Sequence, residues 1–419
     1  MAHKFGLKLW STNTDYYFDE AKRLYANGVF SYVEMYVIPD SGGFIEKWKT
    51  LGVPINLHCP HFLHGFNLAS KEKENYNRQI YDQVKQFADE LCSDYIVFHC
   101  GIDGTVEETV RQLKNFNESR AVIENKPYRP RPEVGGRQCR GATVEEIKYI
   151  LKEVGCGFCL DVGHAICSAN SQKIDRWKYL EEFNKLSPKA YHLTDMEDIE
   201  SECDSHIHIG KGQMDVRRVL SFIDEGSVVT VETEKSYERD LRDFEHDIAL
   251  LRVFLDCRNV ILSKMTEEYI YNSYKWIKNA ELRELFLMQH EPSLENHLQH
   301  FENLKYDDTQ YVFAICVGGV HVGNCGFKYV NSSTLSAEIW IYIGESNFRN
   351  LGLGRNAVLI LLNLGKELLN LQKVIVHVAD FNEVAIKLYK SVGFVPMGEE
   401  NDDMWKRTNC SVIKMELDL

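Results

Sequence analysis

The sequence predicts an α/β protein with two domains, an eight-stranded (β/α)8 barrel followed by a smaller mixed α/β domain. Strand-like and helix-like segments alternate eight times before residue 257, and after residue 265 the pattern changes to one that includes a β-hairpin. The length of 419 residues also exceeds what one hydrophobic core usually supports. We therefore expect a barrel over residues 1–257 and a second domain over residues 265–419.

Each predicted barrel strand is a short apolar run with a polar end. In chain order the strands are FGLKLW (5–10), YVEMYV (32–37), INLHCP (55–60), YIVFHC (95–100), RAVIEN (120–125), FCLDVGH (158–164), AYHLTD (190–195) and VVTVET (228–233). The helical segments that follow them span residues 16–28, 42–52, 73–92, 105–116, 143–155, 174–186, 214–226 and 239–255. Eight such units in about 250 residues favour a TIM barrel over an open, doubly wound sheet. Gly28, Gly52, Gly155 and Gly226 are expected to end their helices in left-handed turns.

The second domain begins after a predicted connection, RNVILSK (258–264). Its expected helices span residues 267–290, 293–302, 356–369 and 383–393. Its expected strands span residues 311–319, 320–330, 337–344, 373–380 and 411–419, and the first two form a hairpin around Gly318 and Gly319.

Composition limits the possible partners and location. No apolar run approaches the roughly 20 residues that span a bilayer, and the start lacks a signal peptide, so a cytoplasmic protein without membrane contact is expected. The net charge of −14 argues against a phosphate-tracking surface, and nucleic acid is therefore not the expected partner. The 12 cysteines are expected to stay reduced, and Cys156 and Cys159, although spaced as CxxC, are expected to fill the core.

Nine residues that can bind metal lie at or just beyond the ends of these strands. They are His58, His99, Glu124, Asp161, His164, His192, Asp204, His206 and Glu232. The carboxyl ends of parallel barrel strands meet at one mouth, so the nine side chains are expected to converge. Five imidazoles favour zinc or another transition metal over magnesium or calcium. Nine ligands suffice for up to three ions, and bridged ions are suited to activating water at a phosphoryl centre.

The nine candidate ligands lie in seven short segments: LHCPHFLHGFNLA, FHCG, VIEN, CLDVGHA, HLTD, DSHIHIGKGQMD and VETE. These segments resemble the signature segments of endonuclease IV, within the xylose isomerase-like barrel superfamily. The resemblance covers residues 1–257 and fills all nine ligand positions. It implies three zinc ions bridged by Glu124. His58 and His99 would bind one ion, Asp161, His192 and Glu232 a second, and His164, Asp204 and His206 a third.

The isomerase and epimerase branches of the same superfamily use one divalent ion, for which manganese is the alternative to zinc. Its ligands would be Glu124, Glu232, Asp161 and His192, and the two glutamates are also the catalytic candidates. Departures from the DNA-acting members disfavour DNA incision. His61 stands where those members carry Tyr, Ser205 stands where they carry Arg, and YVIPDSGG lacks their Gln/Arg wedge.

Four further residues near the predicted ligands have no ligand position in the resemblance. His61, His64 and His208 are expected to be pocket or loop residues. Glu34, at the end of the second strand, faces either the cavity or solvent.

A Gly-rich turn follows the strand over residues 337–344 and opens a helix. Backbone amides at such a turn can bind pyrophosphate. Residues 265–419 contain, in this order, a strand, R-x-x-G-x-G, a helix, a strand, Asn382 and A-x-K-L-Y-x-x-x-G-F (385–394). This order resembles the GNAT acetyltransferases over the whole segment. The resemblance implies that acetyl-CoA binds through residues Arg349, Asn350, Leu351, Gly352, Leu353, Gly354 and Arg355, with Asn382 near the pantetheine arm. Tyr389 would protonate the departing thiolate, and Glu338 is the candidate base.

These expectations combine into a bifunctional enzyme. A metal-dependent barrel of the sugar isomerase or epimerase kind is joined to an N-acetyltransferase that acts on an amino sugar or sugar nucleotide. Two alternatives stay open for the barrel: a zinc-dependent phosphoesterase similar to an abasic-site endonuclease, and a non-catalytic sugar-binding module. In these cases the acetyltransferase would modify a protein or a small amine. The oligomeric state is not predicted.

Overall fold

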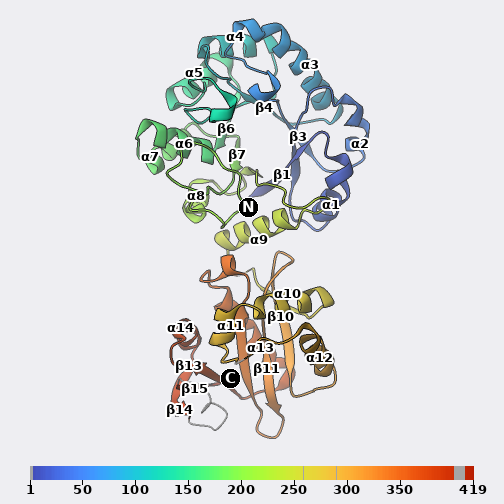
Figure 1. Ribbon diagram of the computed structural model, residues 1–419, viewed down its shortest axis with the longest axis vertical. Helices are drawn as coiled ribbons and strands as arrows, with labels where there is room; N and C mark the ends of the chain where they lie inside the picture. Colours follow the sequence, from blue (N-terminus) through green and yellow to red (C-terminus); the bar gives the residue numbers. More distant parts are fainter. Residues whose placement is uncertain (1–2, 258, 289, 401–410) are drawn as a thin grey trace. The chain divides into compact units, whose positions relative to one another are not determined.

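The computed structural model describes residues 3–257, 259–288, 290–400 and 411–419 (Figure 1). The chain folds into two compact units, residues 1–248 and 249–419. The division falls inside helix α9 (Arg242–Leu255). The predicted boundaries at residues 257 and 265 stay a prediction, and each unit is described by itself.

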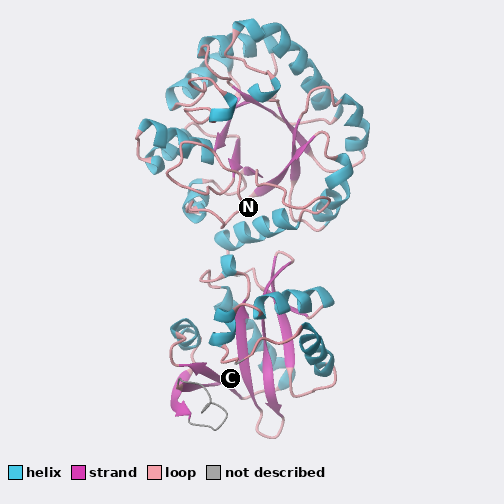
Figure 2. Ribbon diagram, in the orientation of Figure 1, coloured by secondary structure: helices cyan, strands magenta, loops and turns pink. Residues whose placement is uncertain are grey.

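The first unit is a closed barrel of eight parallel strands in the order β1 to β8, with β1 paired to both β2 and β8. Helices surround the ring of strands (Figure 2). The predicted fold is thereby confirmed. The strands are β1 (Lys4–Trp10), β2 (Tyr32–Tyr36), β3 (Ile55–His58), β4 (Ile96–His99), β5 (Ala121–Glu124), β6 (Gly157–Asp161), β7 (Ala190–Leu193) and β8 (Val228–Val231).

The α-helices of this part are α1 (Thr14–Ala26), α2 (Ile45–Lys49), α3 (Glu74–Glu90), α4 (Val106–Phe116), α5 (Val144–Val154), α6 (Val162–Gln172), α7 (Arg176–Asn184), α8 (Val216–Phe222) and α9. Four 3-10 turns join them, η1 (Gly42–Phe44), η2 (Phe62–His64), η3 (Lys71–Lys73) and η4 (Pro132–Val134). Helix α6 was not predicted. It begins directly after β6 because Asp161 Oδ1 accepts the His164 backbone N–H at 2.7 Å, an N-cap that ends the strand.

Helix ends follow the expected chemistry. The Thr143 hydroxyl caps α5 by accepting the Glu146 backbone N–H at 3.2 Å, and Gly155 ends the helix with a φ of 73°. Gly28, Gly52 and Gly226 also have positive φ, at 68°, 71° and 82°. The left-handed conformation predicted at these four glycines is confirmed, but Gly226 does not end its helix, because α8 ends at Phe222 with Ile223 as its C-cap.

The amino-terminal half of the barrel interior is packed with side chains. Tyr32, Tyr95, Val122, Cys159 and Ala190 belong to one buried cluster there. Gly6 leaves room for the Tyr32 ring, since a Cβ on Gly6 would lie 2.2 Å from Tyr32 Cζ. The polar side chains are therefore left to the carboxyl ends of the strands, as in other TIM barrels.

The second unit contains a seven-stranded mixed sheet in the order β14-β15-β13-β12-β11-β10-β9. Only β12 and β13 pair in parallel among its described strands. The strands are β9 (Ile261–Lys264), β10 (Tyr311–Val317), β11 (Val320–Asn331), β12 (Ser336–Ile343), β13 (Lys373–Ala379), β14 (Val395–Glu400) and β15 (Val412–Asp418). The helices are α10 (Glu267–Ile277), α11 (Ala280–Leu285), α12 (Leu294–Leu304), α13 (Leu353–Leu369) and α14 (Glu383–Ser391), with a 3-10 turn η5 (Ser346–Phe348).

The hairpin of β10 and β11 around Gly318 and Gly319 is confirmed, and three local predictions are corrected. The expected connection contains strand β9, because its residues pair with the edge of β10. The expected helix over 267–290 is interrupted at Asn279, whose side chain caps α11 by accepting the Glu281 backbone N–H at 2.8 Å. Strand β14 was not predicted. Residues 258 and 289, which fall in these predicted segments, lie outside the described residues.

None of the helices in the described part of the chain is long and apolar enough to cross a membrane.

Candidate functional sites

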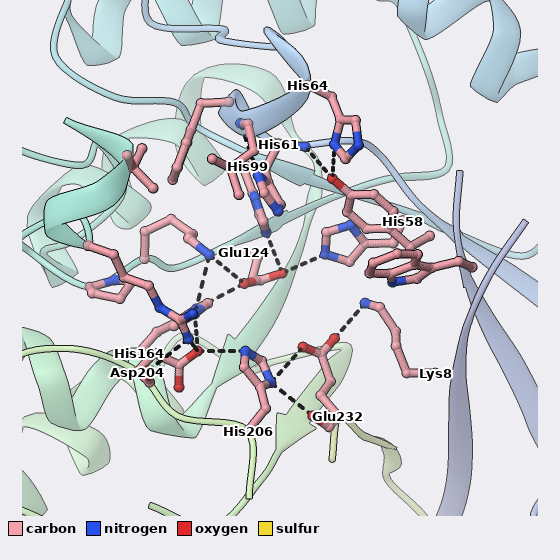
Figure 3. A pocket seen from close by; sticks show the side chains of 18 of the residues that line it. Lys8, His58, His61, His64, His99, Glu124, His164, Asp204, His206 and Glu232 are labelled. Carbon is pink, nitrogen blue, oxygen red and sulfur yellow. Dashed lines mark hydrogen bonds and ion pairs between the residues drawn. The ribbon is translucent and has the colours of Figure 1, made fainter. Parts of the chain in front are cut away.

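A cavity of about 570 Å³ opens at the carboxyl ends of the barrel strands (Figure 3). Four predicted metal ligands, His58, His99, Glu124 and Asp161, are the last residues of β3, β4, β5 and β6. The other five lie on β7, at the start of α6, or in the loops at the same end: His164, His192, Asp204, His206 and Glu232. The barrel thus brings all nine to one mouth.

The Glu124 carboxylate lies at the centre of the first ligand group. Its Oε2 atom is 3.0 Å from His58 Nε2 and 3.0 Å from His99 Nε2. Its Oε1 atom is 3.0 Å from His164 Nδ1. Burial acts to raise the pKa of Glu124, but His99 and Lys126 outweigh it and hold that pKa well below its usual range. The charged carboxylate is therefore in place to join ligand groups, as a bridging residue must.

The protonation of His58 tests whether a metal ion fits here. His58 Nδ1 lies 2.7 Å from the Cys59 carbonyl oxygen, so the proton of the neutral ring donates there. Its Nε2 atom then presents a lone pair to Glu124 Oε2. Burial also lowers the pKa of His58, which disfavours a second ring proton. A cation between the two atoms would remove this repulsion, so the residues fit a bound metal.

The second predicted group gathers around His192. Its Nδ1 atom is 3.1 Å from Glu232 Oε1, 3.3 Å from Glu124 Oε2 and 4.0 Å from Asp161 Oδ2. Burial raises the pKa of Asp161 to about 6. These four residues are also the set that the single-ion isomerases require.

The third predicted group is assembled on Asp204. Its Oδ2 atom is 2.8 Å from His206 Nε2 and 3.4 Å from His164 Nε2. Its other oxygen, Oδ1, is buried without a hydrogen-bond partner among the described residues. Burial acts to lower the pKa values of His164 and His206, but Asp161 and Asp204, respectively, outweigh it and raise them to about 10 and about 9. Both rings therefore carry a proton that a bound metal would displace.

Three charged residues in or beside this cavity were not predicted as site residues. Lys126 Nζ lies 3.2 Å from His164 Nε2 and 3.6 Å from Glu124 Oε1. Lys8 lies 2.7 Å from Glu34 and 2.5 Å from Glu232. Glu34, for which the sequence left two orientations open, points into the barrel and is fully buried. Two features of the sequence could have pointed to these residues. Lys126 follows the predicted ligand Glu124 by two residues, and Lys8 and Glu34 carry opposite charges on consecutive strands.

The remaining histidines have partners outside the ligand groups. His64 Nδ1 lies 3.0 Å from the Tyr36 hydroxyl, and His61 Nδ1 accepts the Leu63 backbone N–H at 3.2 Å. His61 and His64 both line the cavity. His208 instead pairs with Asp247, its Nδ1 atom 2.9 Å from Oδ2.

No disulfide joins the cysteines in the described part of the chain. The eleven cysteines described there are all free thiols. Cys159 belongs to the buried cluster of the barrel, while Cys156 is half-buried.

In the second unit, the Gly-rich turn leads into α13 as predicted. Gly352 is the N-cap residue with a φ of 83°, and no side chain caps this helix. The first amides of α13 are therefore open to an acceptor from a ligand. Leu353 is buried, whereas Arg355 is exposed. The Arg349 side chain donates from Nε to the Ile343 carbonyl at 3.0 Å, so it holds the end of β12 beside the turn. Asn350 has a φ of 60°, and Leu351 is half-buried.

The predicted acid and base differ in their surroundings. Burial raises the pKa of Tyr389, so its phenol stays protonated at neutral pH. Burial acts to raise the pKa of Glu338 as well, but His377 and Lys328 outweigh it and lower that pKa. Glu338 Oε1 lies 2.8 Å from Lys328 Nζ and 3.2 Å from His377 Nδ1, contacts that weaken a carboxylate as a base. The Asn382 side chain caps α14 by accepting the Ala385 backbone N–H at 3.1 Å.

The fold and the sites together define a TIM barrel with candidate metal-binding groups at its mouth, followed by an acyltransferase domain. Residues 33–253 match the family described as xylose isomerase-like TIM barrel, which is more than half of the chain. The chain belongs to this family. Residues 259–395 match the acetyltransferase (GNAT) domain. Both resemblances drawn from the sequence are confirmed, and the chain is an enzyme with an acetyltransferase domain and a barrel of the isomerase and endonuclease type.

Two known proteins are similar to separate parts of the chain. An N-acetyltransferase 9-like protein from Dictyostelium discoideum is 25% identical over 166 residues, which are 34% of this chain and 78% of that protein. A probable endonuclease 4 from Thermoplasma volcanium is 25% identical over 169 residues, which are 37% of this chain and 58% of that protein. The chain thus spans little more than half the length of the second relative.

Among solved structures, spermidine N-acetyltransferase from Vibrio cholerae in complex with CoA and spermine is similar to part of the chain. It is 20% identical, covers 38% of this chain and 95% of its own, and has a TM-score of 0.35.

Proposed function

We propose that the barrel is a zinc-dependent phosphoester hydrolase. The observation that carries this proposal is the third ligand group, in which Asp204 Oδ2 lies 2.8 Å from His206 and 3.4 Å from His164. A single-ion isomerase has no use for these three residues. A site for several ions suits hydrolysis, because metals activate water and stabilise the attacking and leaving oxygens.

The chain's own residues divide this work. Glu124 joins the ligand groups, and Glu232 and His192 hold the side of the site nearest β1. Lys126 lines the cavity beside Glu124, where its ammonium can bind a phosphate oxygen. The cavity volume of about 570 Å³ suits a small phosphoester, and the missing DNA wedge favours such a substrate over a duplex.

Isomerisation is the second candidate, because Glu124, Asp161, His192 and Glu232 also converge. Elemental analysis and turnover distinguish the two. About three zinc ions per chain, with cleavage of bis(p-nitrophenyl) phosphate, support hydrolysis. About one manganese per chain, with no cleavage of that ester or of an abasic-site duplex by zinc-loaded protein, would overturn it.

For the second unit we propose acetyl transfer from acetyl-CoA to an amine. The uncapped start of α13 supports pyrophosphate binding at residues 349–355, and a protonated Tyr389 suits the return of a proton to the CoA thiolate. We propose an amino sugar or sugar nucleotide as acceptor, by analogy with the sugar isomerase that the description of the barrel family names. Release of CoA thiol with an amino-sugar nucleotide tests this substrate class. Release only with spermidine or a peptide amine would overturn it.

A further inference from the structure

We propose that Lys8 is a catalytic residue of the barrel, a fixed ammonium that binds an anionic oxygen of the substrate beside Glu232. We further propose that Glu34 is the positioning residue that holds Lys8 there. The inference rests on the proposed phosphoester chemistry and names the residue that would recognise the charged group.

Strand register places Lys8 inside the barrel. Successive side chains of a strand point to opposite faces, so Gly6 and Lys8 of β1 share a face. Gly6 faces the interior, because the ring of Tyr32, which belongs to the buried cluster, fills the space that a Cβ on Gly6 would occupy. Lys8 is directly paired with Glu34 on β2. On the other side, the ladder between β1 and β8 ends at Leu7 and Val231, one residue before Lys8 and Glu232.

Glu34 is held by a complete set of donors. Its carboxylate is 0% exposed and accepts from Lys8 at 2.7 Å, from the Tyr95 hydroxyl at 3.0 Å and from the Thr230 hydroxyl at 2.9 Å. His192 Nε2 also lies 2.9 Å from it. A buried carboxylate is costly unless such partners satisfy it. Glu34 is therefore a rigid anchor for the ammonium and for the imidazole.

Lys8 has one donor left for a ligand. An ammonium carries three N–H bonds, and two of them reach Glu34 Oε1 at 2.7 Å and Glu232 Oε1 at 2.5 Å. The described residues supply no third acceptor. The side chain is 13% exposed, and it lines the cavity that the metal ligands surround (Figure 3). The third N–H is therefore available to substrate.

A purely structural ion pair is the alternative interpretation of this contact. Replacing a buried ion pair by apolar residues of similar size is often neutral or stabilising, so stability alone gives no reason for a lysine at this position. A cation does have a use where a substrate brings negative charge next to Glu232 and Glu34. The ammonium contacts Glu232 Oε1, the oxygen that also lies 3.1 Å from His192 Nδ1, whereas Oε2 lies 4.0 Å from His206 Nδ1.

In the hydrolysis itself Lys8 keeps its proton. A water oxygen bonds to phosphorus, the P–O bond to the leaving group breaks, and the proton from water ends on the departing alcohol. Lys8 donates a hydrogen bond to a non-bridging phosphoryl oxygen throughout.

The test measures binding rather than turnover. Inorganic phosphate is titrated calorimetrically into the zinc-loaded full chain of the wild type and of Lys8→Met, and zinc content is measured for each. We expect unchanged zinc content and a phosphate Kd that rises about tenfold to a hundredfold, the range of a lost charge-assisted hydrogen bond. Lys4→Met is the matched control, because Lys4 is an exposed residue of the same strand. It should bind phosphate as the wild type does.

Two results would overturn the inference. One is a phosphate Kd within twofold of the wild-type value, and the other is a loss of phosphate binding that merely follows a loss of zinc. Lys8→Gln replaces Lys8→Met in the same comparison if the methionine variant does not fold. Glu34→Gln should weaken phosphate binding in the same direction, because it loosens Lys8. A wild type that binds phosphate through Lys8 but cleaves no ester would refute the proposed hydrolysis and leave the binding role intact.

Discussion

His58 Nε2 and Glu124 Oε2 lie 3.0 Å apart although each carries a lone pair in its preferred protonation state. The Cys59 carbonyl takes the single ring proton of His58, and burial disfavours a second one. Two lone pairs at this distance repel each other unless a cation lies between them. This relationship favours a bound cation at this position, independently of the similarity to known proteins.

Glu124→Gln is expected to lose metal. The amide keeps the shape of the side chain but removes the charge that faces His58, His99 and His164. We expect at least one zinc ion fewer per chain by elemental analysis. Glu107→Gln, an exposed position on α4, is the control and should keep the wild-type content. Full zinc content in Glu124→Gln would contradict the bridging role.

Asp204→Asn tests the third ligand group separately. It should lower zinc content by about one ion and reduce phosphoester cleavage about 10- to 100-fold or more, because His164 and His206 lose their shared carboxylate. Acetyl transfer should not change. Asp198→Asn, an exposed residue of the same loop, is the control. Unchanged zinc and cleavage in Asp204→Asn would favour the single-ion isomerase.

Zinc binding is expected to release protons. Without metal, the pKa values of His164 and His206 are raised to about 10 and about 9, so both rings are charged at pH 7.5. Burial acts to lower the pKa of His192, but Cys159 and Glu232 outweigh it and hold that pKa well above its usual range. Metal binding needs neutral imidazoles and should release about three protons per chain, one each from His164, His206 and His192. Calorimetry in two buffers of different ionisation enthalpy measures this number. Proton uptake, or no release, would contradict it.

The rings of His164 and His206 also set a pH window for the metal-free chain. Because both pKa values are raised on folding, their contribution to stability is fully present below about pH 6.5 and is lost as the pH rises through 9 and 10. Urea unfolding at pH 6 and pH 9.5 should therefore give a lower midpoint at the higher pH. Asp204→Asn should reduce this difference, since Asp204 raises the pKa of His206.

The features of the fold and of the site that depend on local sequence pattern could be predicted from the sequence. The alternation of strand-like and helix-like segments predicted the barrel. The polar ends of the strands predicted that His58, His99, Glu124 and Asp161 lie at its mouth. The contact between Lys8 and Glu34 could not be predicted in this way. It depends on which residues of β1 face inward and on the register with β2, and neither follows from a single apolar run.

Strand β9 was missed for a related reason. Its four residues show no alternation of their own, and they form a strand because the edge of β10 accepts their backbone. Pairing of this kind is a tertiary property. Helix α6 was missed for a different reason, because its signal was present in the sequence. Asp161 is a residue type that caps helices, and it accepts the backbone N–H of His164, three residues later.

Gly352→Ala tests the Gly-rich turn of the second unit. Gly352 has a φ of 83°, a conformation that costs a residue with a Cβ about 1–2 kcal/mol. We expect lower stability and an acetyl-CoA Kd raised several-fold, since the first amides of α13 would shift. Gly318→Ala is a matched control, because this hairpin glycine also has positive φ, at 55°. It should lose stability without losing acetyl-CoA affinity, and equal affinity in both variants would contradict the binding role of the turn.

Tyr389→Phe separates catalysis from binding in the acetyltransferase domain. Burial raises the pKa of Tyr389, so the residue holds a phenolic proton that it can give to a departing thiolate. Loss of a general acid typically costs about 10²- to 10⁴-fold in rate. We expect a fall in kcat of that order with an acetyl-CoA Kd within twofold of the wild-type value. The ring itself should stay in place, because its edge-to-face contact with Phe394, at 5.3 Å between centroids, does not need the hydroxyl. Tyr329→Phe, on an exposed part of β11, is the control. If Tyr389→Phe keeps the wild-type kcat, the thiolate takes its proton from another donor, and the buried tyrosine serves only to pack α14 against Phe394.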